Sequence, residues 1–344
     1  MSMLSHPLPP LRLLAVPKET LWGGRNLETI VGKTLAPAAL IGETWETATE
    51  STVADGPLGG ETVGALVERY GKELLGWRAI EVLGHRFPLL AKFIDAQQWL
   101  SVQVHPDDAY AAAHEGGKLG KTETWYILHA EPGAQIVYGL SREATQDEVA
   151  AAIAANTLES LLETRTVAAG DVVFVPAGTV HAIGAGVVLY ELQQYSDITY
   201  RLYDYGRLQA DGTPRELHVA KALSVMRYGP RDARVRPASL DDRTLPDGAR
   251  RVLSASRYFV LEELALAGGW TSETSGASCE IVTLLEGQCE IASARGAVHA
   301  RKGETVVLPA TLGRYSLQGE ARLVRSYVPE EDAPGLRAWN AAQG

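Results

Sequence analysis

One short pattern occurs twice in the chain and constrains its architecture more than any other feature. Residues 170–181 and residues 303–314 both begin with Gly, five further residues, Pro and Ala. Repetition of this kind indicates two related structural units. The first copy ends on His181, whereas the second has Arg314 at the same position. The sequence therefore predicts two similar units whose chemistry differs.

Short segments rich in Val, Ile, Leu and Tyr lie between frequent Gly and Pro residues, which is typical of β-strands. The expected strands are residues 87–93, 124–128, 135–138, 171–175, 187–192, 280–285, 305–308 and 322–327. Helical periodicity is clear only over residues 62–75, 145–162 and 216–226. We therefore expect a mainly β fold of two barrels or jelly rolls, with helical insertions in and around the first, and not a doubly wound sheet.

Residues 230–250 are polar, contain prolines and lack periodicity, which is typical of a linker. We expect a catalytic, metal-binding domain over residues 1–235, a linker over 236–250, a degenerate second barrel over 251–330 and a tail over 331–344. Because Arg314 replaces a histidine, the second barrel is expected to bind no metal and to serve as structure or as a cover for the site.

Composition restricts the partners of the chain. The formal net charge is −10, which argues against a nucleic-acid or anionic-membrane surface. No apolar run reaches the length of a membrane span, and no signal peptide is visible. The chain has 2 cysteines, Cys279 and Cys289, which we expect to be buried thiols in a reducing cytoplasm. A monomer or a weak homo-oligomer is expected.

Three separate segments offer metal ligands. Ser101, Gln103 and His105 share one face of an expected strand, and a buried polar face is unfavourable unless something binds there. Glu123 begins an apolar strand, and the turn after Pro176 presents His181. Two imidazoles and a carboxylate are a common catalytic zinc set that also suits iron, copper or nickel, with the Gln103 amide as a fourth ligand. The alternative is that the histidines are hydrogen-bonded core residues.

The same segments carry a family resemblance. Residues 170–181 match the second cupin signature, Gly-x5-Pro-x-Gly-x2-His, although Ala185 replaces its usual terminal Asn. The first signature departs from His-x-His, because Gln103 precedes His105 and Glu123 follows much later. Residues 101–108, 120–126 and 195–201, together with residues 22–24 and 42–46, resemble the class I mannose-6-phosphate isomerase family in its short bacterial form. The resemblance runs from about residue 15 to 330.

The resemblance implies a zinc-dependent aldose–ketose isomerase that interconverts mannose 6-phosphate and fructose 6-phosphate. It places one zinc ion on His105, Glu123 and His181, with Gln103 as a fourth ligand in some members. Arg201 matches the active-site arginine of the family, and Lys121 matches the lysine that precedes the metal-binding Glu.

Such a reaction moves a proton between C1 and C2 through an enediolate, so it needs a general base. Glu191 is our candidate, because it shares an inward strand face with Gln193; the alternative is a structural ion pair. Lys92 lies in an otherwise apolar strand and is expected to face the cavity as a phosphate ligand, with Arg207 as a second candidate.

Further substrate contacts are expected from four residues on separate segments. Asp197 is expected to orient a cation or a ligand histidine. Trp22 either packs on the sugar ring or belongs to the core. Ser101 and Glu46 complete the predicted substrate-binding set.

Two other hypotheses compete with the isomerase. One is a different cupin enzyme, either an iron dioxygenase or another metal-dependent sugar-phosphate isomerase. The other is a non-catalytic sugar-binding cupin such as the sensor module of a regulator. The sensor hypothesis leaves Lys121, Glu191 and Arg201 without a role, and the cations suited to phosphate disfavour the dioxygenase.

Overall fold

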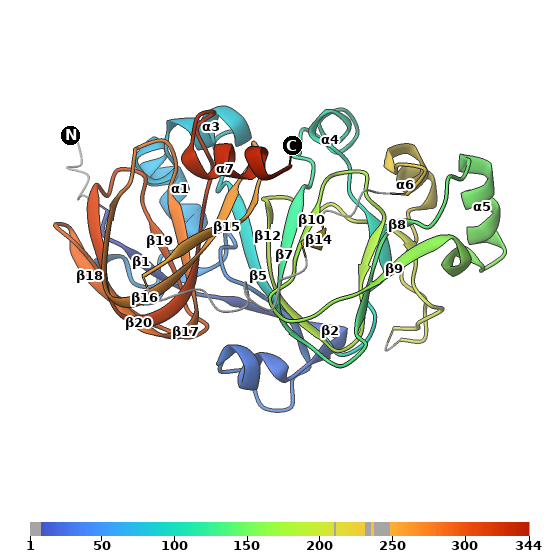
Figure 1. Ribbon diagram of the computed structural model, residues 1–344, viewed down its shortest axis with the longest axis horizontal. Helices are drawn as coiled ribbons and strands as arrows, with labels where there is room; N and C mark the ends of the chain where they lie inside the picture. Colours follow the sequence, from blue (N-terminus) through green and yellow to red (C-terminus); the bar gives the residue numbers. More distant parts are fainter. Residues whose placement is uncertain (1–7, 210, 231–234, 237–247, 344) are drawn as a thin grey trace.

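The computed structural model describes residues 8–209, 211–230, 235–236 and 248–343 (Figure 1). Within these residues the strands form three antiparallel sheets, which confirms the predicted mainly β fold. The seven-stranded sheet has the order β14 (Val235–Arg236), β10 (Val172–Val175), β7 (Glu123–Ala130), β12 (Val187–Gln194), β5 (Leu89–Ala96), β3 (Ile41–Trp45) and β2 (Val16–Gly24). The five-stranded sheet has the order β13 (Tyr200–Tyr203), β6 (Val102–Val104), β11 (His181–Ile183), β8 (Gln135–Leu140) and β9 (Leu162–Thr166).

These two sheets face each other across one apolar cluster. Trp125 and Leu189 of the seven-stranded sheet pack there with Ile136 and Ile183 of the five-stranded sheet. We call the two sheets and the space between them the first β unit. Its interior is where the predicted site residues converge.

The seven-stranded sheet is buried on both faces. Side chains alternate along a strand, so Ile94 and Leu189 point into the first β unit while Phe93 and Tyr190 pack on the opposite side. Every residue of β5 and of β12 is buried. Burial on both faces explains why these strands appear in the sequence as nearly continuous apolar runs.

The eight-stranded sheet forms the second β unit, at the left of Figure 1. Its order is β15 (Arg250–Ala255), β16 (Val260–Glu273), β20 (Arg314–Tyr327), β17 (Glu280–Ser293), β19 (Thr305–Leu308), β1 (Leu11–Leu14) and β4 (Thr52–Val53), with β18 (Gly296–Arg301) paired to β17. Strands β1 and β4 thus come from the segment that was expected to lie wholly in the first domain. Leu11 and Leu13 are buried, and β1 pairs with β19 in the register Leu11 to Val307. The expected linker lies mostly outside the described residues.

Short helices surround the sheets. They are η1 (Leu27–Val31), η2 (Gly56–Leu58), α1 (Val63–Tyr70), α2 (Lys72–Leu75), α3 (Trp77–Leu83), α4 (Asp108–His114), α5 (Gln146–Ala154), η3 (Leu158–Leu161), α6 (Val219–Val225) and α7 (Pro334–Gln343). Residues from α4, α5 and α6 share one apolar cluster with Val102 and Val104, so these helices cover the outer face of the five-stranded sheet. Among the described helices, none is both long and apolar enough to cross a bilayer.

The three predicted helices are present but shorter than their periodicity suggested. Residues 62–75 break at Gly71, whose φ of +44° separates α1 from α2. Thr145 and Glu148 form a capping box that starts α5, but the helix stops at Ala154. Residues 331–344, expected to be a tail, contain α7, whose Trp339 packs against Ala255 and Val260.

The two copies of the repeat occupy equivalent places. Each contains a four-residue strand, β10 or β19, and each ends on the first residue of the next strand, which is His181 in β11 and Arg314 in β20. The side chains differ completely in environment. His181 is 0% exposed, whereas the Arg314 side chain is 91% exposed and pairs with Glu273 at 3.4 Å. Arg314 is therefore a surface residue and does not occupy the interior of the second β unit.

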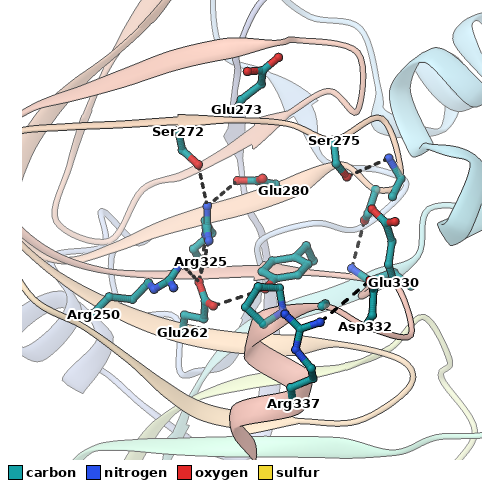
Figure 2. A pocket seen from close by; sticks show the side chains of 16 residues that line it. Arg250, Glu262, Ser272, Glu273, Ser275, Glu280, Arg325, Glu330, Asp332 and Arg337 are labelled. Atoms are coloured by element: carbon teal, nitrogen blue, oxygen red, sulfur yellow. Dashed lines mark hydrogen bonds and ion pairs between the residues drawn. The ribbon is translucent and has the colours of Figure 1, made fainter.

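A buried charge network lies in the second β unit instead (Figure 2). Arg325 donates to Glu262 at 2.7 Å and lies 3.4 Å from Glu280, and its guanidinium stacks 5.1 Å from the Trp270 ring and 5.4 Å from the Tyr327 ring. The network borders a cavity of about 360 Å³. Because these charges are buried, loss of any one of them would leave its partners without compensation.

We expect Arg325→Ala to destabilise the protein by about 3–5 kcal/mol, because it removes the buried cation that Glu262 and Glu280 share. Urea unfolding followed by circular dichroism measures the loss. The matched control is Arg314→Ala, which removes an exposed arginine and is expected to change the free energy of unfolding by about 0.5 kcal/mol or less. Equal stability of the two variants would contradict this role of Arg325.

Candidate metal centre and active site

Three strands bring the predicted metal ligands together inside the first β unit. His105 follows β6, Glu123 is the first residue of β7, and His181 is the first residue of β11. His181 lies directly opposite Gln103 in the register of β11 and β6. Val102 and Val104 point to the outer cluster, so the alternation of β6 turns Gln103 inward, as the sequence predicted.

The ligand atoms are close enough to share one ion. The distance from His105 Nε2 to Glu123 Oε2 is 3.4 Å, and that from His181 Nε2 to Glu123 Oε1 is 3.3 Å. One ligand atom from each of the three residues lies within 4.8 Å of the others, and all three side chains are buried. The Gln103 amide lies 3.3 Å from His181 Nε2, at the edge of the same centre.

Both imidazoles are held in the tautomer that metal binding needs. The Nδ1 atom of His105 lies 2.8 Å from the carbonyl oxygen of Ile198, and that of His181 lies 2.8 Å from the carbonyl oxygen of Thr179. When Nδ1–H donates to these carbonyls, the lone pair of each Nε2 points at Glu123. His105 Nε2 and Glu123 Oε1 are buried without a hydrogen-bond partner. Such orphaned atoms fit a bound divalent cation.

Electrostatics favour the ligand protonation states. Burial, assisted by Lys121, lowers the pKa of His105 to about 3, and burial also lowers the pKa of His181. Burial alone would raise the pKa of Glu123, but Lys121 and the two histidines outweigh it and the pKa is lowered. The Lys121 Nζ atom lies 2.8 Å from Glu123 Oε2. The site therefore presents two neutral imidazoles and one carboxylate.

A second ionic cluster lines the same interior. Lys92 Nζ lies 3.1 Å from Glu191 Oε2 and 3.4 Å from Glu43 Oε2. Trp125 Nε1 donates to Glu191 Oε1 at 3.1 Å, because Glu191 lies opposite both Lys92 and Trp125 in the sheet. Glu191 is thus held on both oxygens.

The pKa values of this cluster follow from burial and pairing. Burial raises the pKa of Glu191, and Lys92 and Lys121 offset only part of the increase. Burial alone would lower the pKa of Lys92, but Glu43 and Glu191 outweigh it and the pKa is raised. Burial alone would raise the pKa of Glu43, yet Lys92 keeps it lowered. Lys92 is therefore a permanent cation next to a carboxylate that is easier to protonate than usual.

Glu43 is a site residue that the sequence prediction missed, and Glu46 was selected in its place. Glu43 and Trp45 share the inward face of β3, and the Trp45 indole donates to Glu43 at 2.5 Å. Glu46 lies on the opposite side, where it accepts from Lys33 at 2.7 Å and from Thr305 at 3.2 Å. Its expected substrate contact is thus replaced by a structural one between the two β units. Side chains alternate along a strand, so Glu43 and Glu46 are expected on opposite faces. The sequence alone does not show which of the two faces is inward.

Arg201 lies at the edge of the interior, opposite Gln103 in the register of β13 and β6. It donates to Ser101 Oγ at 3.1 Å and to the carbonyl oxygen of Glu216 at 2.8 Å. Burial lowers the pKa of Arg201, and the neighbouring Arg215 lowers it further.

Two more arginines accompany Arg201. Arg207 and Arg215 both pair with Asp204, Arg215 through a contact of 2.7 Å from its Nε atom. Burial alone would raise the pKa of Asp204, but these two guanidiniums outweigh it and the pKa is lowered. Arg201 lies within electrostatic range of all three groups, which leaves a local excess of positive charge. We call Arg201, Asp204, Arg207 and Arg215 the arginine cluster.

The remaining predicted residues lie elsewhere. Trp22 is buried among the apolar side chains of the interior and packs closely on Gly42, where a Cβ atom would lie 2.6 Å from its ring. Asp197 is exposed and pairs with Lys118 at 2.9 Å, so backbone carbonyls orient the ligand histidines in its place. Cys279 and Cys289 are buried free thiols, as predicted.

Comparison with known proteins shows which family the chain is similar to. Residues 11–130 match the family model of the phosphomannose isomerase type I catalytic domain, and residues 250–328 match that of the mannose-6-phosphate isomerase cupin domain. The chain is 37% identical to mannose-6-phosphate isomerase ManA of Bacillus subtilis over 323 residues, which cover 93% of this chain and 99% of the relative. It is 36% identical to the mannose-6-phosphate isomerase of Streptococcus mutans over 325 residues, with coverage of 93% and 99%.

A solved structure of a family member is also similar to this chain. The crystal structure of the mannose 6-phosphate isomerase from Bacillus subtilis superposes with a TM-score of 0.81 and 34% sequence identity. The superposition covers 93% of this chain and 99% of that structure. The similarity therefore extends over both β units.

We expect His105→Ala and His181→Ala to weaken metal binding by more than the roughly 10–100-fold that is typical for changes to outer residues of such sites. Metal content after dialysis, measured by mass spectrometry, tests this directly. His299→Ala is the control, because the His299 side chain is 82% exposed. Full metal retention in either ligand variant would contradict the assignment.

Proposed function

Because the chain belongs to the class I mannose-6-phosphate isomerase family, we propose that it interconverts mannose 6-phosphate and fructose 6-phosphate by proton transfer between C1 and C2. The observation that supports this most strongly is the shared interior. Two neutral histidines and Glu123, with unpartnered ligand atoms, lie in the same space as the buried Glu191. We further propose that His105, Glu123 and His181 hold one zinc ion, with Gln103 as a fourth ligand. Lewis-acid polarisation of the C1 and C2 oxygens is the chemistry that such an ion supplies when bound.

Glu191 is the proposed general base. It is buried, and its pKa is raised, which brings a carboxylate toward the range useful for proton transfer near neutral pH. The indole of Trp125 fixes one of its oxygens and Lys92 fixes the other side. These two contacts fix the orientation of the carboxylate, and Lys92 stabilises its ionised form.

Lys121 and Arg201 are the proposed cations for the developing negative charge. Lys121 is buried beside Glu123, so its ammonium group is fixed at the centre. Arg201 is half-buried at the rim and held by Ser101. Preorganised cations of this kind stabilise an enediolate without reorganisation during the reaction.

We propose the arginine cluster as the phosphate subsite. Lys92 was the sequence-based candidate, but it lies between Glu43 and Glu191, which already neutralise it. In the arginine cluster, by contrast, Asp204 balances only part of the positive charge. Planar guanidiniums also match the geometry of phosphate oxygens. We also infer a cytoplasmic location, which suits the two free thiols.

The proposed function is tested by a coupled assay that follows fructose 6-phosphate formed from mannose 6-phosphate. We expect turnover in the metal-loaded protein, loss of activity after dialysis against a chelator and recovery when zinc is added back. Activity that survives complete metal removal, verified by elemental analysis, would refute the role of the metal. Folded, zinc-loaded protein without turnover would refute the isomerase.

We expect Arg215→Ala to raise KM for mannose 6-phosphate by about tenfold, while kcat changes less than about threefold, since a lost charge-assisted contact to phosphate is worth roughly 1.5–3 kcal/mol. Steady-state kinetics at low and high salt measure both constants. Arg142→Ala is matched in charge and removes an exposed arginine that pairs with Glu148. If KM is the same in both variants, the phosphate lies elsewhere.

A further inference from the structure

A single carboxylate outside the reacting groups connects the second β unit to the loop that precedes Glu123. Asp108, at the start of α4, accepts hydrogen bonds on both oxygens. Its Oδ1 accepts from Gly120 N at 2.9 Å and from Gln194 Nε2 at 2.9 Å. Its Oδ2 accepts from Tyr258 OH at 2.6 Å and from Arg257 Nη2 at 3.1 Å. We call these five residues the Asp108 bridge.

The bridge fixes the backbone on both sides of Lys121. Gly120 is bound directly by Asp108, and Thr122 N donates to Gln194 Oε1 at 2.9 Å. Lys121 N donates to the carbonyl oxygen of Pro106 at 3.0 Å. Strand β7 and the ligand Glu123 begin immediately afterwards. The position of the Lys121 and Glu123 side chains therefore depends on this loop.

The same carboxylate lies close in sequence to the other ligand segment. Asp108 follows His105 by three residues, and Gly120 precedes Glu123 by three residues. The two segments touch, because a Cβ atom at Gly120 would lie 2.4 Å from the carbonyl carbon of Asp107. Only glycine allows this approach. Asp108 thus joins two segments that both carry metal ligands.

The second β unit presents its half of the bridge on a tight turn between β15 and β16. Ser256 N donates to the carbonyl oxygen of Phe259 at 2.8 Å, and Ser256 Oγ accepts from Tyr258 N at 3.2 Å. Phe259 is completely buried and packs edge to face against Phe174 of β10. The Arg257 guanidinium lies 4.7 Å from the centre of the Tyr258 ring. The turn is therefore anchored before it reaches Asp108.

We propose that Asp108 is a positioning residue for the metal-centre loop and that the second β unit acts on the reaction through Tyr258 and Arg257. This inference rests on the proposed isomerase function. The two β units do not need the bridge to stay in contact, because Tyr126, Glu263 and Arg322 already join them. That contact lies on the outer face of β7. The Asp108 bridge differs because it holds the loop that sets Lys121 and Glu123.

Three variants and one control test this role at full metal occupancy. Asp108→Ala is expected to lower kcat by about 10–100-fold, the range expected when a reacting group is displaced by about 1 Å, with KM within about threefold. Asp108→Asn retains an acceptor for Gly120 but turns an amide NH2 group toward Arg257, so it is expected to recover only part of kcat. Tyr258→Phe removes one hydroxyl group from the bridge and is expected to lower kcat by about three- to tenfold. The control Tyr126→Phe removes an equivalent hydroxyl from the other contact and is expected to lower the melting temperature without lowering kcat.

The outcomes separate the inference from the function. If Asp108→Ala and Tyr258→Phe keep kcat within about twofold of wild type, the bridge serves docking only and the inference is wrong. If Asp108→Ala does not fold, Tyr258→Phe decides the question alone. If the wild type has no isomerase activity, the proposed function fails. Zinc release to a competing chelator still tests the bridge in that case: faster release from Tyr258→Phe than from Tyr126→Phe supports it, and equal release overturns it.

Discussion

The interior of the first β unit depends on pairing each buried cation with a buried carboxylate. Lys92 lies between Glu43 and Glu191, and Lys121 lies beside Glu123. Without partners these charges would shift to their neutral forms or prevent folding. Two cations face three carboxylates, so this interior has a formal charge of −1, and a divalent ion would change it to +1. The loaded interior would then favour an anionic sugar phosphate and the negative charge that develops on it.

Much of this site could be predicted because strands and turns obey local rules. The alternation of β6 placed Gln103 inward, and the glycine and proline turn placed His181 at a strand start. Local rules do not say which face of an isolated strand is inward, so Glu46 was selected instead of Glu43. They also do not reveal side-chain pairs within an irregular segment, which is why Asp204 and Arg215 were missed. The backbone carbonyls of Ile198 and Thr179 that orient the histidines leave no trace in side-chain chemistry.

The acidic chain concentrates its cations where an anion is expected. The formal net charge is −10, yet Arg207 and Arg215 pair with a single Asp204, and Arg201 lies within electrostatic range of all three. The second β unit has no comparable excess in its buried network, where Arg325 is shared by Glu262 and Glu280. The two units thus differ in how they treat buried charge. The first β unit has buried ligand atoms without hydrogen-bond partners, whereas the second β unit pairs its buried charges with one another.

The pairing of β1 with β19 has a consequence for how the chain folds. Leu11 and Val307 are neighbours in the sheet, although nearly the whole sequence lies between them. During synthesis β1 leaves the ribosome long before β19 is made. The apolar residues of β1 therefore stay exposed to water while the first β unit forms. Contacts of such high sequence separation also slow the search for the native state. Completion of the second β unit is therefore expected to be a late event that ties together both ends of the described chain.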